Sequence, residues 1–277
     1  MSTESEKQAP GYVHGFTEKE QNRLYHQARF MEQRVHDRLP FHRSTEMLEI
    51  GCGVGAQSEI LLRRYPGLRV TGLDASDENL GRAQAHLASL SMADGRYECV
   101  KGNALALDFP AGRFDSAFLC WVLEHVPDPA RVLSEARRCL RPGSHIAVTE
   151  VQNMSFFLNP YSPNTMAYWL AFNDHQLELG GDPFVGAKLG NLLLQVGYRD
   201  IRTRVHSVHL DNRSPGERAE FLEFWTDLLL SGAEGLLSAG KTTPDIVDGM
   251  REELDQVGHH PDAVFFYSFV QATARVF

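Results

Sequence analysis

Short apolar segments alternate with segments of helical spacing between residues 45 and 151. The apolar segments occupy residues 46–50, 69–74, 97–101, 114–120 and 145–151, and the intervening helical patterns end near residue 64 or span about 77–91 and 129–140. Short buried strands that alternate with amphipathic helices are typical of a parallel sheet covered on both faces. The pattern therefore predicts an α/β fold for this part of the chain.

The flanking residues follow a different pattern. Residues 17–20 read as a capping box followed by apolar residues at helical spacing, so we expect a helix over about 18–39. Residues 152–180 are rich in aromatic side chains. Beyond them we expect a helix near 185–196, a strand near 201–210, a helix that begins with a capping box at 214–217, and a final strand over 263–276.

The charge balance argues against a nucleic-acid partner, because 36 acidic residues stand against 27 basic ones and the formal net charge is -9. No apolar run approaches the roughly 18 residues of a membrane-spanning helix, and the first residues lack the apolar stretch of a secretory signal. The four cysteines are far apart, and His259 and His260 show no metal-binding spacing. These features predict a cytoplasmic protein with reduced thiols, no metal site and no membrane partner.

A glycine-rich stretch, EIGCGVG at residues 49–55, lies between the first predicted strand and the following helix. Glycines at such a turn let the chain bend tightly and let a ligand reach backbone N–H groups. Asp74 ends the second predicted strand, where a carboxylate can accept both hydroxyls of a ribose. These features predict a cofactor site at the carboxyl edge of the sheet. Alone, the glycines also fit a structural turn, and Gly51, Gly53 and Ala56 satisfy the looser dinucleotide pattern.

Five stretches in this order resemble the class I S-adenosylmethionine-dependent methyltransferases: LEIGCGVG, VTGLDAS, GNALALDFP, FDSAFLCWVLEHV and LRPGSHIAVTE. Glu49, two residues before the first glycine, distinguishes the pattern from a nicotinamide site. The resemblance covers about residues 46–150 and implies a doubly wound, Rossmann-like, mostly parallel α/β sheet of seven strands. Within this single domain we expect a tail and cap helix at 1–44, the S-adenosylmethionine-binding core at 45–151, and substrate-lid insertions with the last strands of the same sheet at 152–277.

The resemblance also implies roles for individual residues. Glu49, Gly51 and Gly53 would shape the pocket for the methionine part of the cofactor, while Asp74 would hold its ribose. Asn103 stands where the family usually has an aspartate that accepts from the adenine amino group, and its carbonyl oxygen can still accept. The predicted cofactor-binding set is Glu49, Gly51, Cys52, Gly53, Gln57, Asp74, Ala75 (near the adenine), Asn79, Asn103, Ala104, Cys120 (through its backbone), Tyr12 and Gln27.

Methyl transfer from a sulfonium is an in-line displacement, so positioning and exclusion of water can suffice. A base is needed only where the acceptor arrives protonated. His125, five residues beyond Cys120 at the predicted active edge, is the candidate base; a histidine that packs or caps a short helix is the alternative. We expect the neighbouring Glu124 to face another way.

The aromatic insertions are the expected walls of the substrate site, where ring faces can also stabilise the sulfonium. Because these insertions are largely apolar, we expect a small-molecule acceptor rather than a macromolecule. The predicted substrate-binding residues are His14, Phe157, Tyr161, Tyr168, Trp169 and Trp225.

Other functions remain open at this point. Some proteins that resemble methyltransferases attack the aminobutyl carbon of the cofactor, in a cyclisation or alkyl transfer that releases methylthioadenosine. A cofactor-binding regulatory protein without turnover is a second alternative. A dehydrogenase is disfavoured by the order of motifs after the third strand. The sequence does not decide between O, N and C as the acceptor atom, or between a monomer and a homodimer.

Overall fold

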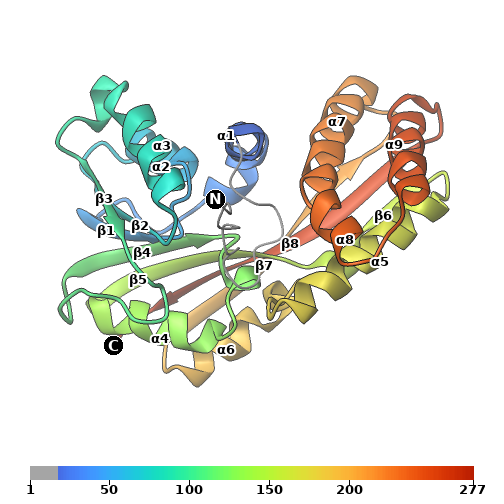
Figure 1. Cartoon of the computed structure of the whole chain (residues 1–277). Helices are drawn as coiled ribbons and strands as arrows, with labels where there is room; N and C mark the ends of the chain where they lie inside the picture. The colour runs from blue at the N-terminus through green and yellow to red at the C-terminus, as the bar shows by residue number, and fades with distance from the viewer. Residues whose placement is uncertain (1–17) are drawn as a thin grey trace, which may run out of the picture.

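The computed structural model describes residues 18–277, which form a mixed sheet with helices on both faces (Figure 1). Within these residues the sheet has eight strands, in the order β3-β2-β1-β4-β5-β8-β6, and β7 also pairs with β8. The strands are β1 (Glu46–Ile50), β2 (Arg69–Asp74), β3 (Tyr97–Lys101), β4 (Phe114–Cys120), β5 (Leu140–Val151), β6 (Phe157–Asn159), β7 (Arg199–Leu210) and β8 (Val264–Arg275).

The first five strands run parallel, whereas β8 is antiparallel to β5, and both β6 and β7 are antiparallel to β8. The predicted α/β fold with a doubly wound, mostly parallel sheet is confirmed. The short strand β6 is an addition to the seven that we expected. It forms where the aromatic stretch runs alongside the beginning of β8, with Phe157 opposite Phe266.

The helices lie on both faces of this sheet. In Figure 1, α2 and α3 lie on one face of the parallel half, α4 and α6 lie on the other, and α1 lies between α2 and α7. The helices are α1 (Glu18–His36), α2 (Ala56–Arg64), α3 (Asp77–Ala88), α4 (Pro129–Cys139), α5 (Pro163–Glu178), α6 (Leu189–Gln195), α7 (Pro215–Ser231), α8 (Ala233–Ser238) and α9 (Pro244–His259).

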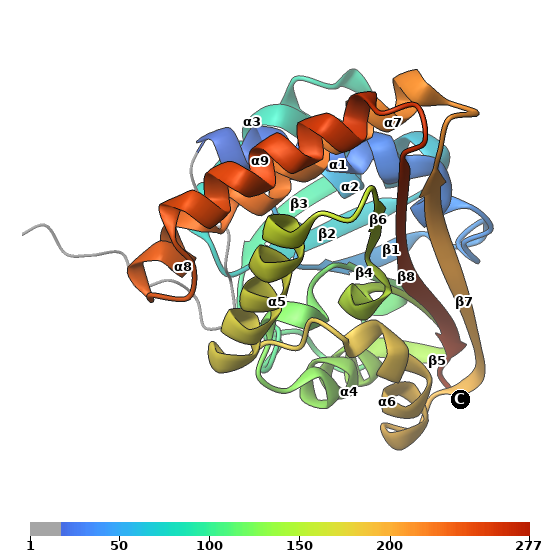
Figure 2. The same cartoon turned by 90° about the vertical axis from the view of Figure 1, so that its right-hand side faces the viewer.

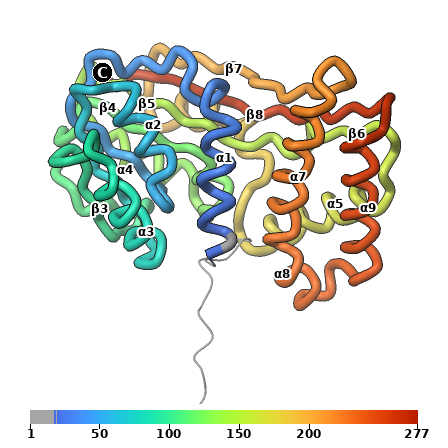
Figure 3. Tube along the Cα trace, turned by 90° about the horizontal axis from the view of Figure 1, so that it is seen from above, coloured from blue at the N-terminus to red at the C-terminus, as the bar shows by residue number. Residues whose placement is uncertain are grey.

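The insertions gather at the end of the sheet that carries β6. Figure 2 shows α5, α8 and α9 at this end, and α9 packs against both α5 and α7. Figure 3 shows α1 beside α7 along the same face. The parallel half and the insertions are therefore connected through α1 on one face and through β8 within the sheet.

The central strands form because both faces of the sheet are covered by apolar helices. In β1, Met47 belongs to the core cluster that includes Met31 of α1 and Leu61 of α2. Leu48 and Ile50 point to the opposite face and join the cluster that includes Leu133 of α4. A strand buried on both sides reads as a continuous apolar run, which is why its bounds could be predicted.

Three local predictions differ from the structure. The helix expected to reach residue 39 ends at His36, and Arg38 has a φ of 55°, in the left-handed region. The side chain of Ser214 makes no capping hydrogen bond at the start of α7, so the predicted capping box is wrong there. The Glu217 side chain instead lies near α1, with its Oε1 atom 3.8 Å from Arg34 Nη2. The sequence patterns also did not predict α5 or α9 as helices.

None of the helices in residues 18–277 is long and apolar enough to span a bilayer. The division into a cap, a core and a lid stays a prediction.

Candidate functional site

A cavity of about 850 Å³ opens at the carboxyl ends of β1, β2, β3 and β4. One part of its wall, the strand-edge lobe, consists of the turns at residues 51–57, 73–79 and 102–105. The other part, the aromatic lobe, comes from α5, α7 and β8. Its members are Trp169, Phe172, Phe221, Phe224, Trp225, Leu228, Leu229 and Tyr267. Residues 121, 122 and 124–127 of the loop after β4 also line the cavity. This loop joins the two lobes, because β4 lies in the sheet between β1, which precedes the glycine turn, and β5, which pairs with β8.

The turn after β1 needs glycine at two positions, for a different physical reason at each. Gly51 and Gly53 have φ values of 71° and 52°, where side chains are strained. A Cβ at Gly51 would lie 2.5 Å from Val122 Cγ2, so packing requires glycine there. A Cβ at Gly53 would meet only Leu24, at 3.9 Å, and Gly53 lines the cavity. Gly53 therefore leaves the backbone open to a ligand.

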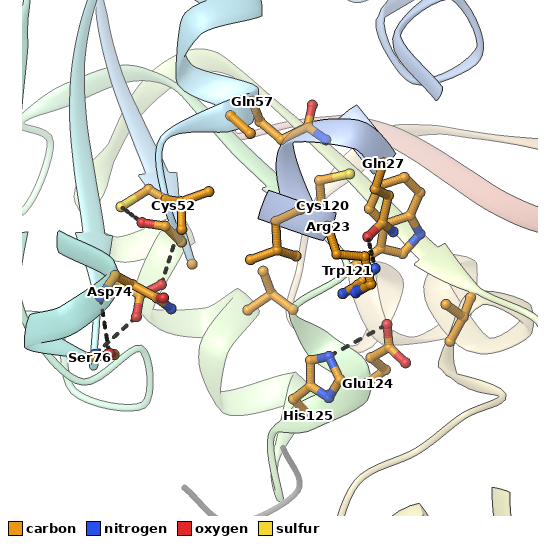
Figure 4. A pocket seen from close by; sticks show the side chains of 18 of the residues that line it. Arg23, Gln27, Cys52, Gln57, Asp74, Ser76, Cys120, Trp121, Glu124 and His125 are labelled. Atoms are coloured by element: carbon orange, nitrogen blue, oxygen red, sulfur yellow. Dashed lines mark hydrogen bonds and ion pairs between the residues drawn. The ribbon is translucent and has the colours of Figure 1, made fainter. Parts of the chain in front are cut away.

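Asp74 is aimed into the cavity by the backbone around it. Its Oδ2 accepts from the Gly53 N–H and its Oδ1 from the Ser76 N–H, both at 2.9 Å (Figure 4). Burial raises the pKa of the Asp74 carboxyl, although these hydrogen bonds lower it. Each oxygen keeps lone pairs for a further donor. The carboxylate is thus placed as a double acceptor for vicinal hydroxyls, and Ala75 and Asn79 line the wall beside it.

Glu49 does not itself line the cavity, and its role in shaping the pocket for the methionine part stays a prediction. Its side chain is buried beneath the turn, where it accepts a hydrogen bond from Ser58 of α2. Burial, together with the nearby Asp74 charge, raises the pKa of Glu49 to about 8, even though the Ser58 hydrogen bond lowers it. Its position indicates that it ties the turn to the first residues of α2.

The ends of β3 and β4 complete the strand-edge lobe. Asn103 and Ala104 line the cavity, and Asn103 Oδ1 already accepts from the Leu105 N–H at 2.9 Å. One lone pair of that oxygen and the side-chain NH2 group remain for a ligand. Cys52 and Cys120 also line the wall. Burial raises the pKa of both thiols well above the usual value, which makes them poor nucleophiles.

The loop after β4 is held by a buried acid that our sequence analysis missed. Glu150 of β5 accepts from the backbone N–H groups of Val122 and Leu123 at 3.0 and 2.7 Å. Burial, followed by the charge of Glu124, raises the pKa of Glu150 to about 8. Trp121 in this loop has a φ of 56°, which is uncommon for a non-glycine residue. The signal for Glu150 was a lone acid in an otherwise apolar strand pattern.

Glu124 and His125 both line the cavity, so the expectation that Glu124 faces another way is wrong. Residues 123–125 form a 3-10 helix, and Figure 4 shows the two side chains next to each other. His125 Nε2 lies 3.7 Å from Glu124 Oε1, and Gln176 Nε2 of α5 lies 3.0 Å from Glu124 Oε2 and 3.5 Å from His125 Nδ1. Sequence spacing gave no signal for Gln176, which comes from a separate insertion.

Helix α1 closes the cavity from the side of the glycine turn. Gln27 and Arg23 line the wall and bind each other, with Arg23 Nη1 2.8 Å from Gln27 Oε1. Gln57 at the start of α2 also lines it and lies 2.7 Å from His36 Nε2. Tyr12 and His14, which we also predicted here, lie outside the described residues.

Only part of the predicted substrate set reaches the cavity. Trp169 and Trp225 line it, with ring centroids 5.6 Å apart. Phe157 and Tyr161 do not, and they are 54% and 78% exposed: Phe157 lies in the edge strand β6, and Tyr161 lies in the connection between β6 and α5. Tyr168 is fully buried, and its hydroxyl donates to the Leu229 carbonyl. Phe157, Tyr161 and Tyr168 therefore do not reach the cavity as predicted. The aromatic residues that line the wall in their place are Phe172, Phe221, Phe224 and Tyr267.

Residues 18–277 contain no group of three histidine, cysteine, aspartate or glutamate side chains that could hold a metal ion. The absence of a metal in the reaction nevertheless stays a prediction. The open backbone at Gly53 and the inward carboxylate of Asp74 do fit a ligand with a ribose and a charged tail. The residues present therefore fit S-adenosylmethionine on structural grounds.

Comparisons with known proteins agree with this site. Residues 48–148 match a family model described as a methyltransferase domain. The chain is 33% identical over 134 residues to a ubiquinone biosynthesis O-methyltransferase of Paracidovorax citrulli, covering 48% of this chain and 51% of that protein. It is 31% identical over 183 residues to the O-methyltransferase resE of Aspergillus sclerotiorum, covering 64% and 66%. The chain thus spans about half the length of the first of these relatives.

Solved structures share the fold at low sequence identity. A phosphoethanolamine N-methyltransferase of Haemonchus contortus, in complex with S-adenosylhomocysteine, has a TM-score of 0.56 and 18% identity over 91% of this chain and 52% of its own. The [4+2]-cyclase SpnF has a TM-score of 0.53 and 20% identity over 92% and 81%. The matched domain, the O-methyltransferase relatives and the shared fold support a class I S-adenosylmethionine-dependent methyltransferase.

Proposed function

We propose that this protein transfers a methyl group from S-adenosylmethionine to a small molecule, with oxygen as the first acceptor atom to test. The main observation that supports this proposal is that the strand-edge lobe and the aromatic lobe belong to one continuous cavity. The curated relatives named above are O-methyltransferases, which favours oxygen over nitrogen or carbon. The product from the cofactor would be S-adenosylhomocysteine.

The strand-edge lobe would hold the cofactor. Asp74 would accept from the ribose hydroxyls, and the bare backbone at Gly53 would lie against the methionine part. Asn103 would contact the adenine with its remaining lone pair or its NH2 group. Gln27 and Arg23 of α1 also line the cavity and would receive the cofactor carboxylate.

When bound, the cofactor supplies a methyl group on a positively charged sulfur, which leaves as a neutral thioether. The protein orients the acceptor against that methyl and keeps water out with the rings of the aromatic lobe. An acceptor hydroxyl loses a proton in the process, and His125 is our candidate to receive it. It lines the cavity, with its Nε2 atom 3.7 Å from Glu124 Oε1.

The by-products of turnover test this function. Purified protein is incubated with S-adenosylmethionine and a panel of small hydroxylated acceptors, and the released nucleosides are separated by chromatography. We expect S-adenosylhomocysteine in amounts that depend on the acceptor. Release of methylthioadenosine would instead support attack at the aminobutyl carbon, and tight cofactor binding without either product would support a regulatory protein.

A further inference from the structure

Glu124 is a buried carboxylate with unused acceptor capacity at the junction of the two lobes. Its side chain is 10% exposed, and its Oε2 accepts a hydrogen bond from Gln176 Nε2 at 3.0 Å. The His125 Nε2 atom lies 3.7 Å from Oε1, beyond normal hydrogen-bond distance. A carboxylate offers about four lone-pair positions, and burying its charge is costly unless they are filled. The carboxylate therefore has room for a donor that enters the cavity.

Gln176 fixes this carboxylate without satisfying it. The amide Nε2 lies 3.2 Å from the Glu124 backbone oxygen and 3.0 Å from Glu124 Oε2. Both neighbours are acceptors, so the NH2 group must face them, and the buried Gln176 Oε1 has no hydrogen-bond partner among the described residues. The glutamine is 1% exposed, so water does not replace these contacts. The orientation of Glu124 toward the cavity is thereby built into α5.

The described wall of the cavity offers little to an anion. Arg23 is the only lysine or arginine among the lining residues of the described part of the chain, and its guanidinium binds Glu20 at 2.6 and 2.8 Å as well as Gln27. Asp74 and Glu124 contribute carboxylates to the same wall. The aromatic lobe adds rings and leucines. An acceptor that carries a phosphate or a carboxylate would be desolvated here without a free cation to pair with.

We propose that Glu124 selects the acceptor: it accepts a hydrogen bond from the O–H or N–H group that becomes methylated before that proton passes to the neighbouring His125, and the cavity admits apolar molecules that carry such a donor and no negative charge. This inference rests on the proposed function and adds the class of substrate. A hydroxyl or amine on a hydrophobic ring system has the required chemistry, because the rings fill the aromatic lobe while the donor meets the carboxylate.

The tryptophans provide a direct readout. The chain has three tryptophans, Trp121, Trp169 and Trp225, and all of them line the cavity. We would titrate the protein, saturated with S-adenosylhomocysteine, with para-butylphenol, para-butylaniline, para-butylanisole and para-butylbenzoate, and follow tryptophan fluorescence. We expect the phenol or the aniline to bind at least about tenfold more tightly than the benzoate and several-fold more tightly than the anisole, which lacks a donor. Equal binding of benzoate and phenol, or no response to any probe, would overturn the proposal.

A charge-removing variant sharpens the test. Glu124→Gln keeps the shape but not the charge, so we expect the phenol to bind about five- to tenfold more weakly and the benzoate to gain affinity. Glu135→Gln on α4 removes another buried carboxylate, one outside the cavity, and should keep the wild-type preference. Calorimetry with S-adenosylhomocysteine checks that each variant retains the cofactor site. An unchanged preference in Glu124→Gln would contradict the role of Glu124.

The two proposals fail in distinguishable ways. Methylthioadenosine as the by-product would remove the proposed methyl transfer while the probe preference persisted. A lost probe preference with normal formation of S-adenosylhomocysteine would remove only the selective role of Glu124. If Glu124→Gln does not fold, the series of probes on the wild-type protein decides by itself.

Discussion

The two lobes of the cavity are made from different parts of the polypeptide. The strand-edge lobe presents backbone groups and short side chains, which are held in place by hydrogen-bonded turns. In the glycine turn, for example, the N–H groups of Gly51 and Cys52 both donate to the Leu73 carbonyl oxygen, at 2.7 and 3.0 Å. The aromatic lobe presents large rings from α5, α7 and β8, which are far apart in sequence. Recognition in the first lobe therefore depends on backbone conformation at a few positions, and in the second on the volume of side chains.

The largest effect should come from the glycine turn, where the comparison can be made within one motif. Gly51→Ala combines a left-handed φ with a Cβ 2.5 Å from Val122, so we expect a loss of about 2–4 kcal/mol in the free energy of unfolding. Gly53→Ala should lose only about 1 kcal/mol, because strain acts there without a clash. Denaturant unfolding of both variants measures the difference, and similar losses would contradict the assigned roles.

The cofactor side depends next on Asp74. Asp74→Ala removes a charged double acceptor, and a hydrogen bond to a charged group contributes about 1.5–3 kcal/mol. We expect at least a tenfold loss of affinity for S-adenosylmethionine, measured by calorimetry on the folded variant. Asp108→Ala, an exposed acid outside the cavity wall, is the matched control and should bind as the wild type does. Unchanged affinity in Asp74→Ala would remove the ribose assignment.

The loop that joins the lobes should show a pH effect of intermediate size. The folded-state pKa of Glu150 is raised to about 8, so the native protein holds this proton above the ordinary pKa of 4.5 while the unfolded chain loses it. The unfolded state then binds fewer protons, and stability falls as pH rises from about 5 to 8, by at most about 1.4 kcal/mol per pH unit for one group.

Glu150→Gln isolates this contribution, because the amide cannot ionise. Unfolding experiments across this pH range should show the wild type losing stability relative to the variant as pH increases. A constant difference between the two proteins would mean that Glu150 does not titrate in this window. Glu49 has a similarly raised pKa, so the single variant should remove only part of the total pH dependence.

The smallest effect should come from one ring of the aromatic lobe. Trp225→Leu removes a side chain that lies 4.9 Å from Tyr267 and 5.6 Å from Trp169 between ring centroids. An aromatic contact contributes about 1 kcal/mol to the binding free energy, so its loss predicts roughly fivefold weaker binding of para-butylphenol. The affinity for S-adenosylhomocysteine should stay unchanged. Phe157→Leu, outside the cavity, should change neither value in calorimetry. An equal effect of both variants would break the distinction between the lobes.

The same difference explains what could be predicted from the sequence. The bounds of β1, β2, β3 and β4 match the apolar segments, because each strand and its turn are encoded within a few consecutive residues. Asp74 and Gly53 could be placed in the site for this reason. Their contacts with an actual ligand stay predictions.

Side chains that converge from distant segments could not be predicted in this way. Gln176 and Tyr267 reach the cavity through the packing of α5 and β8, which no local pattern records. Phe157 and Tyr168 were chosen for their residue type alone, and the structure turns one to solvent and buries the other beneath the wall. Glu124 was misjudged because its side chain is oriented by Gln176 of the distant helix α5, whose Nε2 lies 3.0 Å from Glu124 Oε2.

The pairing of β8 has a consequence for synthesis on the ribosome. This strand occupies an interior place in the sheet, between β5 and β7, yet it is the last of the described strands to be translated. Until it emerges, the parallel half of the nascent chain would present the open edge of β5, a template for unwanted strand pairing that chaperones would need to shield. Tyr267 arrives with β8 as well. A nascent chain would therefore complete its glycine turn and Asp74 well before it completes the aromatic wall.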